Sequence, residues 1–139
     1  MKIGLDFHGV IDAYPELFTG LTEKWVRKGH EIHILTGKEW IYTEAKIKKL
    51  NISYTHHFSI VDYHLKKGTK MVKRKSGWWM DEVVWDKSKG DYSKKNGITI
   101  HFDNDLEYAK WFPKNCNFIL VRKKNFEDLI TLLRNNLHI

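Results

Sequence analysis

The sequence predicts an α/β protein in which helices cover both faces of a central, parallel, five-stranded sheet. Short apolar segments with β-branched residues alternate along the 139 residues with longer segments of helical period, which is typical of successive β-α units. The interior of the second apolar segment, from Ile32 to Leu35, shows little alternation, as expected for a strand that is covered on both faces. The length is about that of one domain.

The first half of the chain contains three expected strands and two expected helices. Residues 2–7 are the first strand, and the period of residues 14–29, with a proline near the start and a glycine at the end, favours a helix. Residues 30–37 are the second strand. Residues 38–51 have a helical pattern, and residues 52–58 read as a third strand.

In the second half, the regular pattern is lost over about residues 61–80, which we interpret as a small insertion that forms a cap or flap on the core. Asp81 is a suitable N-cap for the next helix, and Gly97 a suitable end. No linker or internal repeat divides residues 1–139, so a single domain is expected. The remaining expected elements are a strand over 98–105, a short helix over 106–112, a strand over 116–121 and a helix over 126–137.

Composition favours an anionic partner. Lysine and arginine number 24 against 17 aspartates and glutamates, which gives a formal charge of +7, and such a surface attracts nucleotides, phosphate esters or nucleic acid. A generally solvated, lysine-rich surface is the alternative. The single Cys116 cannot form an internal disulfide, and no stretch approaches the roughly 20 apolar residues of a membrane span. We therefore expect a soluble, cytoplasmic protein of undetermined oligomeric state, without a membrane partner.

Three of the expected strands end in an oxygen-bearing side chain, namely Asp6, Thr36 and Asp103. In open parallel sheets, ligands bind beyond the carboxyl ends of the strands, so these side chains are expected to meet at one edge. Two carboxylates can hold a divalent cation such as Mg²⁺, and a hydroxyl can bind a phosphate. Gly9 and Gly37, which follow closely, allow backbone N–H groups to approach an anion.

This set of residues resembles the haloacid dehalogenase (HAD)-like superfamily of phosphohydrolases, in a small, single-domain, nucleotidase-like form. The resemblance is carried by "IGLDFHGVID" as the first motif, "HILTG" as the second, a lysine before the last motif and "ITIHFDND" as the acidic fourth motif. These motifs span nearly the whole chain in the family's order. The resemblance implies a Rossmann-like three-layer sandwich and a Mg²⁺-dependent phosphatase that forms an aspartyl-phosphate.

Carried over by position, the family's roles fall on five residues. Asp6 resembles the nucleophile and a metal ligand, the backbone carbonyl of His8 a second metal ligand, and Asp103 the acidic metal ligand of the fourth motif. Thr36 resembles the phosphate-binding hydroxyl. Lys89 best resembles the lysine that neutralises the nucleophile and the phosphoryl oxygens, and Lys87 is the second choice.

The chain departs from the family pattern in two places. His8 replaces the aspartate that usually acts as acid and base, and because a histidine can do both, we expect catalysis to involve His8. The alternative is a catalytically silent protein that binds phosphate or nucleic acid. In the fourth motif, Asn104 separates Asp103 from Asp105, and the roles of Asp105 and Glu107 are left open.

The substrate is expected to be a nucleotide or another small phosphate ester. The expected insertion carries the basic segment Lys66–Lys75, followed by Trp78 and Trp79, and cations beside aromatic rings suit the phosphate and base of a nucleotide. A polynucleotide end is the natural extension, and an aromatic flap packed on the core with solvated lysines is the alternative. Asp12 has a structural explanation at a helix start, and we see no metal spacing among the histidines.

Overall fold

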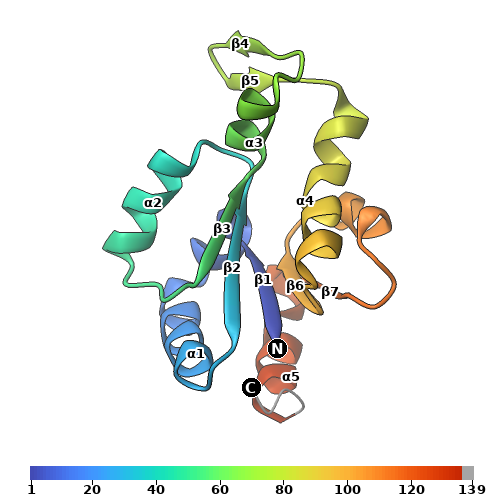
Figure 1. The fold of residues 1–139 in the computed structure, drawn as a ribbon. Helices are drawn as coiled ribbons and strands as arrows, with labels where there is room; N and C mark the ends of the chain where they lie inside the picture. Colours follow the sequence, from blue (N-terminus) through green and yellow to red (C-terminus); the bar gives the residue numbers. More distant parts are fainter. Residues whose placement is uncertain (136–139) are drawn as a thin grey trace.

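A computed structural model describes residues 1–135 and confirms an α/β fold around a parallel, five-stranded sheet (Figure 1). The strand order is β3-β2-β1-β6-β7, and every pairing in this sheet is parallel. A separate antiparallel hairpin pairs β4 with β5. The strands are β1 (Lys2–Asp6), β2 (Glu31–Thr36), β3 (His56–Ser59), β4 (Val72–Arg74), β5 (Gly77–Trp79), β6 (Ile100–Asp103) and β7 (Asn117–Leu120).

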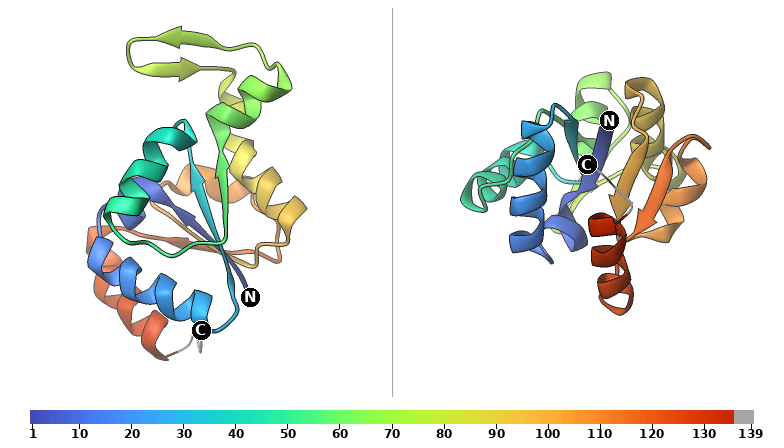
Figure 2. Two further views of the ribbon diagram at one scale, coloured as in Figure 1. Left: turned by 60° about the vertical axis from the view of Figure 1, so that its left-hand side comes forward. Right: turned by 90° about the horizontal axis from the view of Figure 1, so that it is seen from below.

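Helices cover both faces of the sheet, so the fold is a Rossmann-like sandwich (Figure 2). Helices α1, α2 and α5 pack on one face, while α3, α4 and the 3₁₀ helix η2 pack on the other. The longer helices are α1 (Pro15–Arg27), α2 (Trp40–Lys49), α3 (Ile60–Lys67), α4 (Glu82–Asn96) and α5 (Phe126–Asn135). Three short helical turns complete the described chain, namely η1 (Phe7–Ile11), η2 (Leu106–Trp111) and η3 (Lys123–Asn125).

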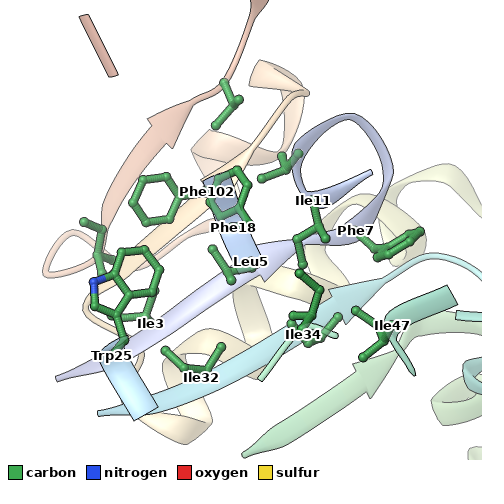
Figure 3. Close-up of a cluster of buried hydrophobic side chains, with 14 of the residues drawn as sticks. Ile3, Leu5, Phe7, Ile11, Phe18, Trp25, Ile32, Ile34, Ile47 and Phe102 are labelled. Carbon is green, nitrogen blue, oxygen red and sulfur yellow. The ribbon is translucent and has the colours of Figure 1, made fainter. Parts of the chain in front are cut away.

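The main core lies between the sheet and the helices α1, α2 and α5 (Figure 3). Trp25 of α1 stacks on Phe102 of β6 with ring centroids 6.2 Å apart, and Ile3 and Leu5 of β1 are fully buried beside them. Burial of a large apolar side chain contributes about 1.5–3 kcal/mol, so this layer fixes the central strands. The strand ends that carry the polar residues are thereby held in place.

The order of the strands creates a crevice at one edge of the sheet. The chain runs outward from β1 to β2 and β3, then crosses over to β6 and β7 on the other side of β1. At such a reversal the connections leave the sheet in opposite directions, and ligands bind at the carboxyl ends of the strands there. The β4-β5 hairpin projects over this same edge (Figures 1 and 2).

The crossover from β3 to β6 differs in part from the expected insertion over residues 61–80. Its first part is the regular helix α3, whose N-cap Ser59 accepts a hydrogen bond from the backbone N–H of Asp62. Gly68 ends α3 in the left-handed conformation with φ 81°, and the hairpin follows. At eight residues, α3 is shorter than the roughly 11–18 residues over which a helical period is recognised, so the sequence pattern did not show it.

Other boundaries differ by a few residues. The third strand begins at His56 instead of residue 52, and the helix expected over 106–112 is the 3₁₀ helix η2. Asp81 and Gly97 cap α4 as expected, with Asp81 Oδ1 accepting from the N–H of Val84. The last two residues of the helix expected over 126–137 lie outside the described residues. None of the helices that the structure describes is long and apolar enough to span a membrane.

A close approach at Gly90 sets the depth of α4. A Cβ at Gly90 would lie 2.2 Å from the backbone oxygen of Trp111, whereas a Cβ at Gly20 of α1 would meet nothing within 4 Å. We expect Gly90→Ala to lower the free energy of unfolding by about 1–3 kcal/mol through overpacking. Gly20→Ala should raise it by about 0.5–1 kcal/mol. Urea unfolding followed by circular dichroism measures both, and equal effects would contradict this packing.

Candidate active site

Two buried carboxylates and one lysine form the centre of the candidate site. Asp6 ends β1 and Asp103 ends the neighbouring strand β6, and both side chains are buried. The Nζ of Lys89, from the middle of α4, donates to Asp6 Oδ1 and to Asp103 Oδ2, each at 3.0 Å. The two strand ends that the sequence brings to one edge therefore meet around a shared ammonium group.

Lys89 is the lysine that reaches this edge. Its side chain is only 4% exposed, and its Nζ lies 4.8 Å from the centre of the Tyr108 ring. Burial lowers the pKa of Lys89, but the two carboxylates raise it further, so the net pKa lies above its usual value and the group stays charged. Lys87 lines a different pocket, between α3 and α4, because residues two apart on a helix do not share a face.

The two carboxylates differ in their protonation. Burial raises the pKa of Asp6 from 3.8 to about 7, against the opposing attraction of Lys89. Burial also raises the pKa of Asp103, but Lys89 and a hydrogen bond from His101 outweigh it and hold this pKa well below its usual range. Asp103 is therefore the permanent counter-ion of Lys89, whereas the charge on Asp6 depends on its surroundings.

Both oxygens of Asp103 are already bonded. Oδ2 accepts from Lys89 and lies 2.9 Å from His101 Nε2, and Oδ1 accepts from the backbone N–H of Asp105 at 3.1 Å. His101 in turn fits against β1 because residue 4 is glycine, where a Cβ would lie 2.5 Å from His101 Nδ1. These bonds hold the carboxylate of Asp103 in place. Because each carboxylate oxygen has two acceptor sites and Oδ1 accepts one hydrogen bond, the expected role of Asp103 as a metal ligand stays a prediction.

The side-chain amide of Asn104 joins two oxygen acceptors of the site. Amide orientation is assigned from hydrogen-bond contacts, and here the amide nitrogen donates to Asp6 Oδ2 at 3.1 Å and to the backbone carbonyl of His8 at 3.2 Å. Asn104 therefore holds the second oxygen of Asp6 and the carbonyl of His8 around one point.

The oxygens around this point are of the kind that magnesium prefers, namely carboxylate and carbonyl oxygens. Asp6 and the backbone carbonyl of His8 are two of the ligands expected from the sequence, and both accept from the amide of Asn104. A bound Mg²⁺ would take these two oxygens, and the Asn104 amide, turned so that its oxygen faces the ion, would supply a third.

The loop after β1 depends on a glycine and on Asp12. Gly9 has φ 79°, and a Cβ there would lie 2.5 Å from Cγ of Asn104, so only glycine leaves room for Asn104. The N–H of Gly9 donates to Asp12 Oδ1 at 2.6 Å, and His8 Nδ1 lies 3.3 Å from Asp12 Oδ2. Asp12 therefore orients both the backbone of Gly9 and the ring of His8. The sequence did not indicate this role, because an aspartate at a helix start has a structural explanation of its own.

The ring of His8 is partly exposed and weakly basic. Burial lowers the pKa of His8 below 6.5, although Asp12 opposes this shift, so the imidazole is mainly neutral at pH 7. His8 Nε2 is covered and has no hydrogen-bond partner among the described residues. A turn of the side chain is needed before this nitrogen can meet a ligand.

In the expected second motif, the turn formed by Gly37 and Lys38 lines the pocket, whereas Thr36 does not. Thr36 is fully buried, and its Oγ1 lies 3.1 Å from Thr43 Oγ1 and accepts from the N–H of Lys38 at 3.3 Å. Gly37 and Lys38 line the adjacent pocket. A Cβ at Gly37 would lie 2.8 Å from the Trp85 ring, so glycine here lets the turn and that ring pack together.

The two remaining acidic candidates separate in space. Asp105 lines the pocket, and its Oδ1 accepts from the N–H of Glu107 as the N-cap of η2. Glu107 is exposed and is not among the residues that line the pocket. Asp105 thus shapes the start of η2 beside the site, while Glu107 lies outside it.

A pocket of about 680 Å³ opens over the carboxylates. Its inner end is formed by Asp6, His8, Lys89 and Asn104, and the tip of the hairpin closes one side. Lysines and aromatic rings share the remaining wall, and most of these residues lie far apart in the sequence, which is why sequence patterns do not group them. These residues are Lys38, Tyr42, Lys75, Trp78, Trp85 and Tyr108.

A second group of possible metal ligands consists of Glu31, His33 and His56, whose ligand atoms lie within 4.8 Å of one another. The two imidazole rings stack with centroids 4.3 Å apart and an angle of 7° between planes. Because imidazole lone pairs lie in the ring plane, parallel rings do not direct them to one point. Both nitrogens of His33 are also engaged, by Glu31 and by Tyr92. This geometry suits a polar network better than a metal centre.

Comparison of the chain with protein-family models, with curated proteins and with solved structures finds no significant match. The functional argument therefore depends on the geometry of the site.

The unequal protonation of the two carboxylates gives a stability test in the absence of divalent cations. Asp6 has a folded-state pKa raised from 3.8 to about 7, so its contribution to stability is present below pH 4 and is lost as the pH rises through 7. We expect Asp6→Asn, which cannot ionise, to be at least as stable as the wild type at pH 8. Asp103→Asn should lose about 3–5 kcal/mol, because it removes a counter-ion of buried Lys89.

Chemical denaturation at pH 5 and pH 8, with a chelator present, measures these differences. The advantage of Asp6→Asn over the wild type should be larger at pH 8 than at pH 5. A loss for Asp6→Asn at pH 8 as large as that for Asp103→Asn would show that both carboxylates are permanently charged.

Proposed function

We propose that the protein is a Mg²⁺-dependent phosphomonoesterase of the HAD-like type, which transfers the phosphoryl group of its substrate to Asp6. The observation that carries the proposal is the position of the Asp6 carboxylate. One of its oxygens accepts from buried Lys89, and the other accepts from the amide of Asn104, which also binds the carbonyl of His8. A carboxylate held in this way beside a pocket is suited to nucleophilic attack on phosphorus.

In the first step, an oxygen of Asp6 attacks phosphorus and the bond from phosphorus to the ester oxygen breaks. Lys89 neutralises charge on the transferring group, and Asp103 keeps Lys89 charged and in place. A bound Mg²⁺ would be held by Asp6, the carbonyl of His8 and Asn104, and would supply positive charge to the phosphoryl oxygens. In the second step, water attacks the phosphorus and releases Asp6 and inorganic phosphate.

His8 is the proposed acid and base of these steps. Its imidazolium form donates a proton to the leaving ester oxygen, and the neutral ring then accepts a proton from the attacking water. Asp12, at 3.3 Å from Nδ1, orients the ring. The lowered pKa of His8 favours its role as a base at neutral pH. We therefore expect His8 to contribute most to the second step, in which water hydrolyses the aspartyl-phosphate.

The pocket supports a nucleotide as the substrate. Lys38 and Lys75 provide positive charge in the pocket wall, and Trp78 and Tyr42 provide aromatic surface there. Phosphate recognition by cations and stacking of a base on an aromatic ring use the same pair of features. A pocket of about 680 Å³ lies within the usual range for small-molecule sites.

One observation favours a second candidate, a phosphate-binding protein without turnover. His8 Nε2 is covered by other atoms, so a ring that cannot turn would leave the site without an acid or base. Capture of the phosphoenzyme distinguishes this candidate from a phosphatase.

The roles of Asp6 and His8 are tested with nucleoside monophosphates and p-nitrophenyl phosphate, both labelled with ³²P. We expect Asp6→Asn to lose at least about 10³-fold in kcat and to trap no label. His8→Ala should lose about 10²–10⁴-fold but accumulate label from p-nitrophenyl phosphate, because that leaving group needs no acid. Asp105→Asn, which also neutralises an acid of the pocket wall, is the control and should retain turnover. Phosphate release by Asp6→Asn at the wild-type rate would refute the proposal.

The role of Asn104 is tested by the dependence on magnesium concentration. Asn104→Ala removes an oxygen from the proposed cation site and should raise the half-saturating Mg²⁺ concentration about 10-fold or more. Asn104→Asp retains an oxygen at that position and should keep or strengthen Mg²⁺ binding. Titration of phosphate release with Mg²⁺ measures both variants. An unchanged requirement in Asn104→Ala would remove this residue from the cation site.

A further inference from the structure

The β4-β5 hairpin has two faces with different surroundings. Across the pair, Lys73 lies opposite Trp78, and Val72 lies opposite Trp79. Side chains alternate between the faces of a strand, so Trp78 and Trp79 point in opposite directions. Trp78 lines the pocket, whereas Trp79 is 50% exposed and is absent from the pocket wall.

The outer face of the hairpin is aromatic, apolar and positively charged. Trp79 and Val72 are 50% and 52% exposed, and the guanidinium of Arg74 lies 5.4 Å from the centre of the Trp79 ring. The indole nitrogen of Trp79 donates to Ser76 Oγ at 3.1 Å, which holds the ring near the hairpin turn. This is an ordered stacking surface, and the alternative of a tryptophan flap packed on the core does not describe Trp79.

The charge around this face is not compensated. Every charged residue from 66 to 75 is a lysine or an arginine, and within residues 1–135 none of them forms a salt bridge. A second copy of the chain docked hairpin to hairpin would bring these cations together, which argues against a dimer through this face. A polyanion with stacking groups matches both the charge and the exposed ring.

We propose that the outer face of the hairpin, defined by Val72, Arg74 and Trp79, binds single-stranded nucleic acid and presents its phosphorylated end to the candidate active site. Stacking of bases on aromatic rings and on arginine, with lysines along the backbone, is how proteins bind single strands without reading sequence. The tip residues Lys75, Ser76 and Gly77 line the pocket and directly follow Arg74, so the surface is continuous with the pocket. The end-group part of this inference rests on the proposed phosphatase function.

The geometry makes a prediction for the two faces. A terminal nucleotide in the pocket contacts the inner face through Trp78, as a free mononucleotide would. Only a longer strand reaches Trp79 and Arg74. Substitutions on the outer face should therefore act on oligonucleotides and spare mononucleotides.

The test compares Trp79→Ala and Arg74→Glu with the wild type on two readouts. The first is the dissociation constant for a fluorescent, unphosphorylated single-stranded 10-mer, measured by anisotropy at two salt concentrations. The second is kcat/KM for a terminally phosphorylated 10-mer and for the matching nucleoside monophosphate. We expect each variant to weaken 10-mer binding about 10-fold and to lower kcat/KM for the 10-mer by a similar factor. Mononucleotide hydrolysis should stay within about twofold.

Matched variants separate the outer face from general effects. Lys28→Glu makes the same change of charge as Arg74→Glu after the end of α1, near the opposite edge of the sheet, and should leave 10-mer binding largely unchanged. Trp79→Phe retains a stacking ring and should recover most of the binding lost in Trp79→Ala. Circular dichroism confirms that each variant is folded.

Wild-type affinity for the 10-mer in both outer-face variants would overturn the inference. Binding of the protein to phosphatidylserine vesicles but not to the 10-mer would also overturn it, because the surface would then serve a membrane. If no ester is hydrolysed, the phosphatase proposal fails separately. The anisotropy series with the unphosphorylated 10-mer still decides whether the hairpin binds single strands.

Discussion

A charged lysine buried between two carboxylates is the constraint on which the candidate site depends. Removing Lys89 from water is costly unless its charge is matched, and Asp6 and Asp103 match it at 3.0 Å each. The close packing of Gly90 against the backbone of Trp111 brings α4 near enough to the sheet for the lysine to reach. One packing contact and one ion-pair network together fix the carboxyl ends of β1 and β6.

The proposed cation would lie beside this network. Two carboxylates share one ammonium group, and burial raises the pKa of Asp6. The second oxygen of Asp6 and the carbonyl of His8 both accept from the amide of Asn104. A divalent cation at that point would stabilise the ionised form of Asp6, which is the form that a nucleophile requires. The Asp6 carboxylate thus both pairs with buried Lys89 and serves as the proposed nucleophile.

The hairpin lies outside the packed core that positions this centre. It lies in the crossover between β3 and β6, after α3 and before α4, so its length and sequence can vary without altering the sheet. Its inner face completes the pocket, and its outer face carries an exposed ring and a basic surface. In the proposed function, this segment would separate contacts with a terminal nucleotide from contacts with a longer strand.

The sequence identified the residues of the site whose signals are local. Asp6 and Asp103 end apolar strands, and Lys89 precedes the last of them, so their order along the chain indicates a common edge. Asn104 and Asp12 were not assigned a role at the site. Both residues have ordinary structural explanations in the sequence, because Asn104 simply follows an acid and Asp12 lies at a helix start. Only the structure shows that Asn104 contacts Asp6 and His8. It also shows that Asp12 contacts His8 and Gly9. The spacing of four residues between His8 and Asp12 was the one signal available.

By itself, the sequence determined the parallel sheet, the helices around it other than α3 and the edge at which the polar residues gather, because apolar period, caps and glycines act over a few residues. The tertiary structure decided the choice between Lys87 and Lys89, the occupation of both Asp103 oxygens, the grouping of the pocket wall and the opposite directions of Trp78 and Trp79. These features depend on the rotation of a helix, the register of a hairpin and the depth of a packed contact. Such quantities arise only when segments distant in the chain pack together, so no local pattern encodes them.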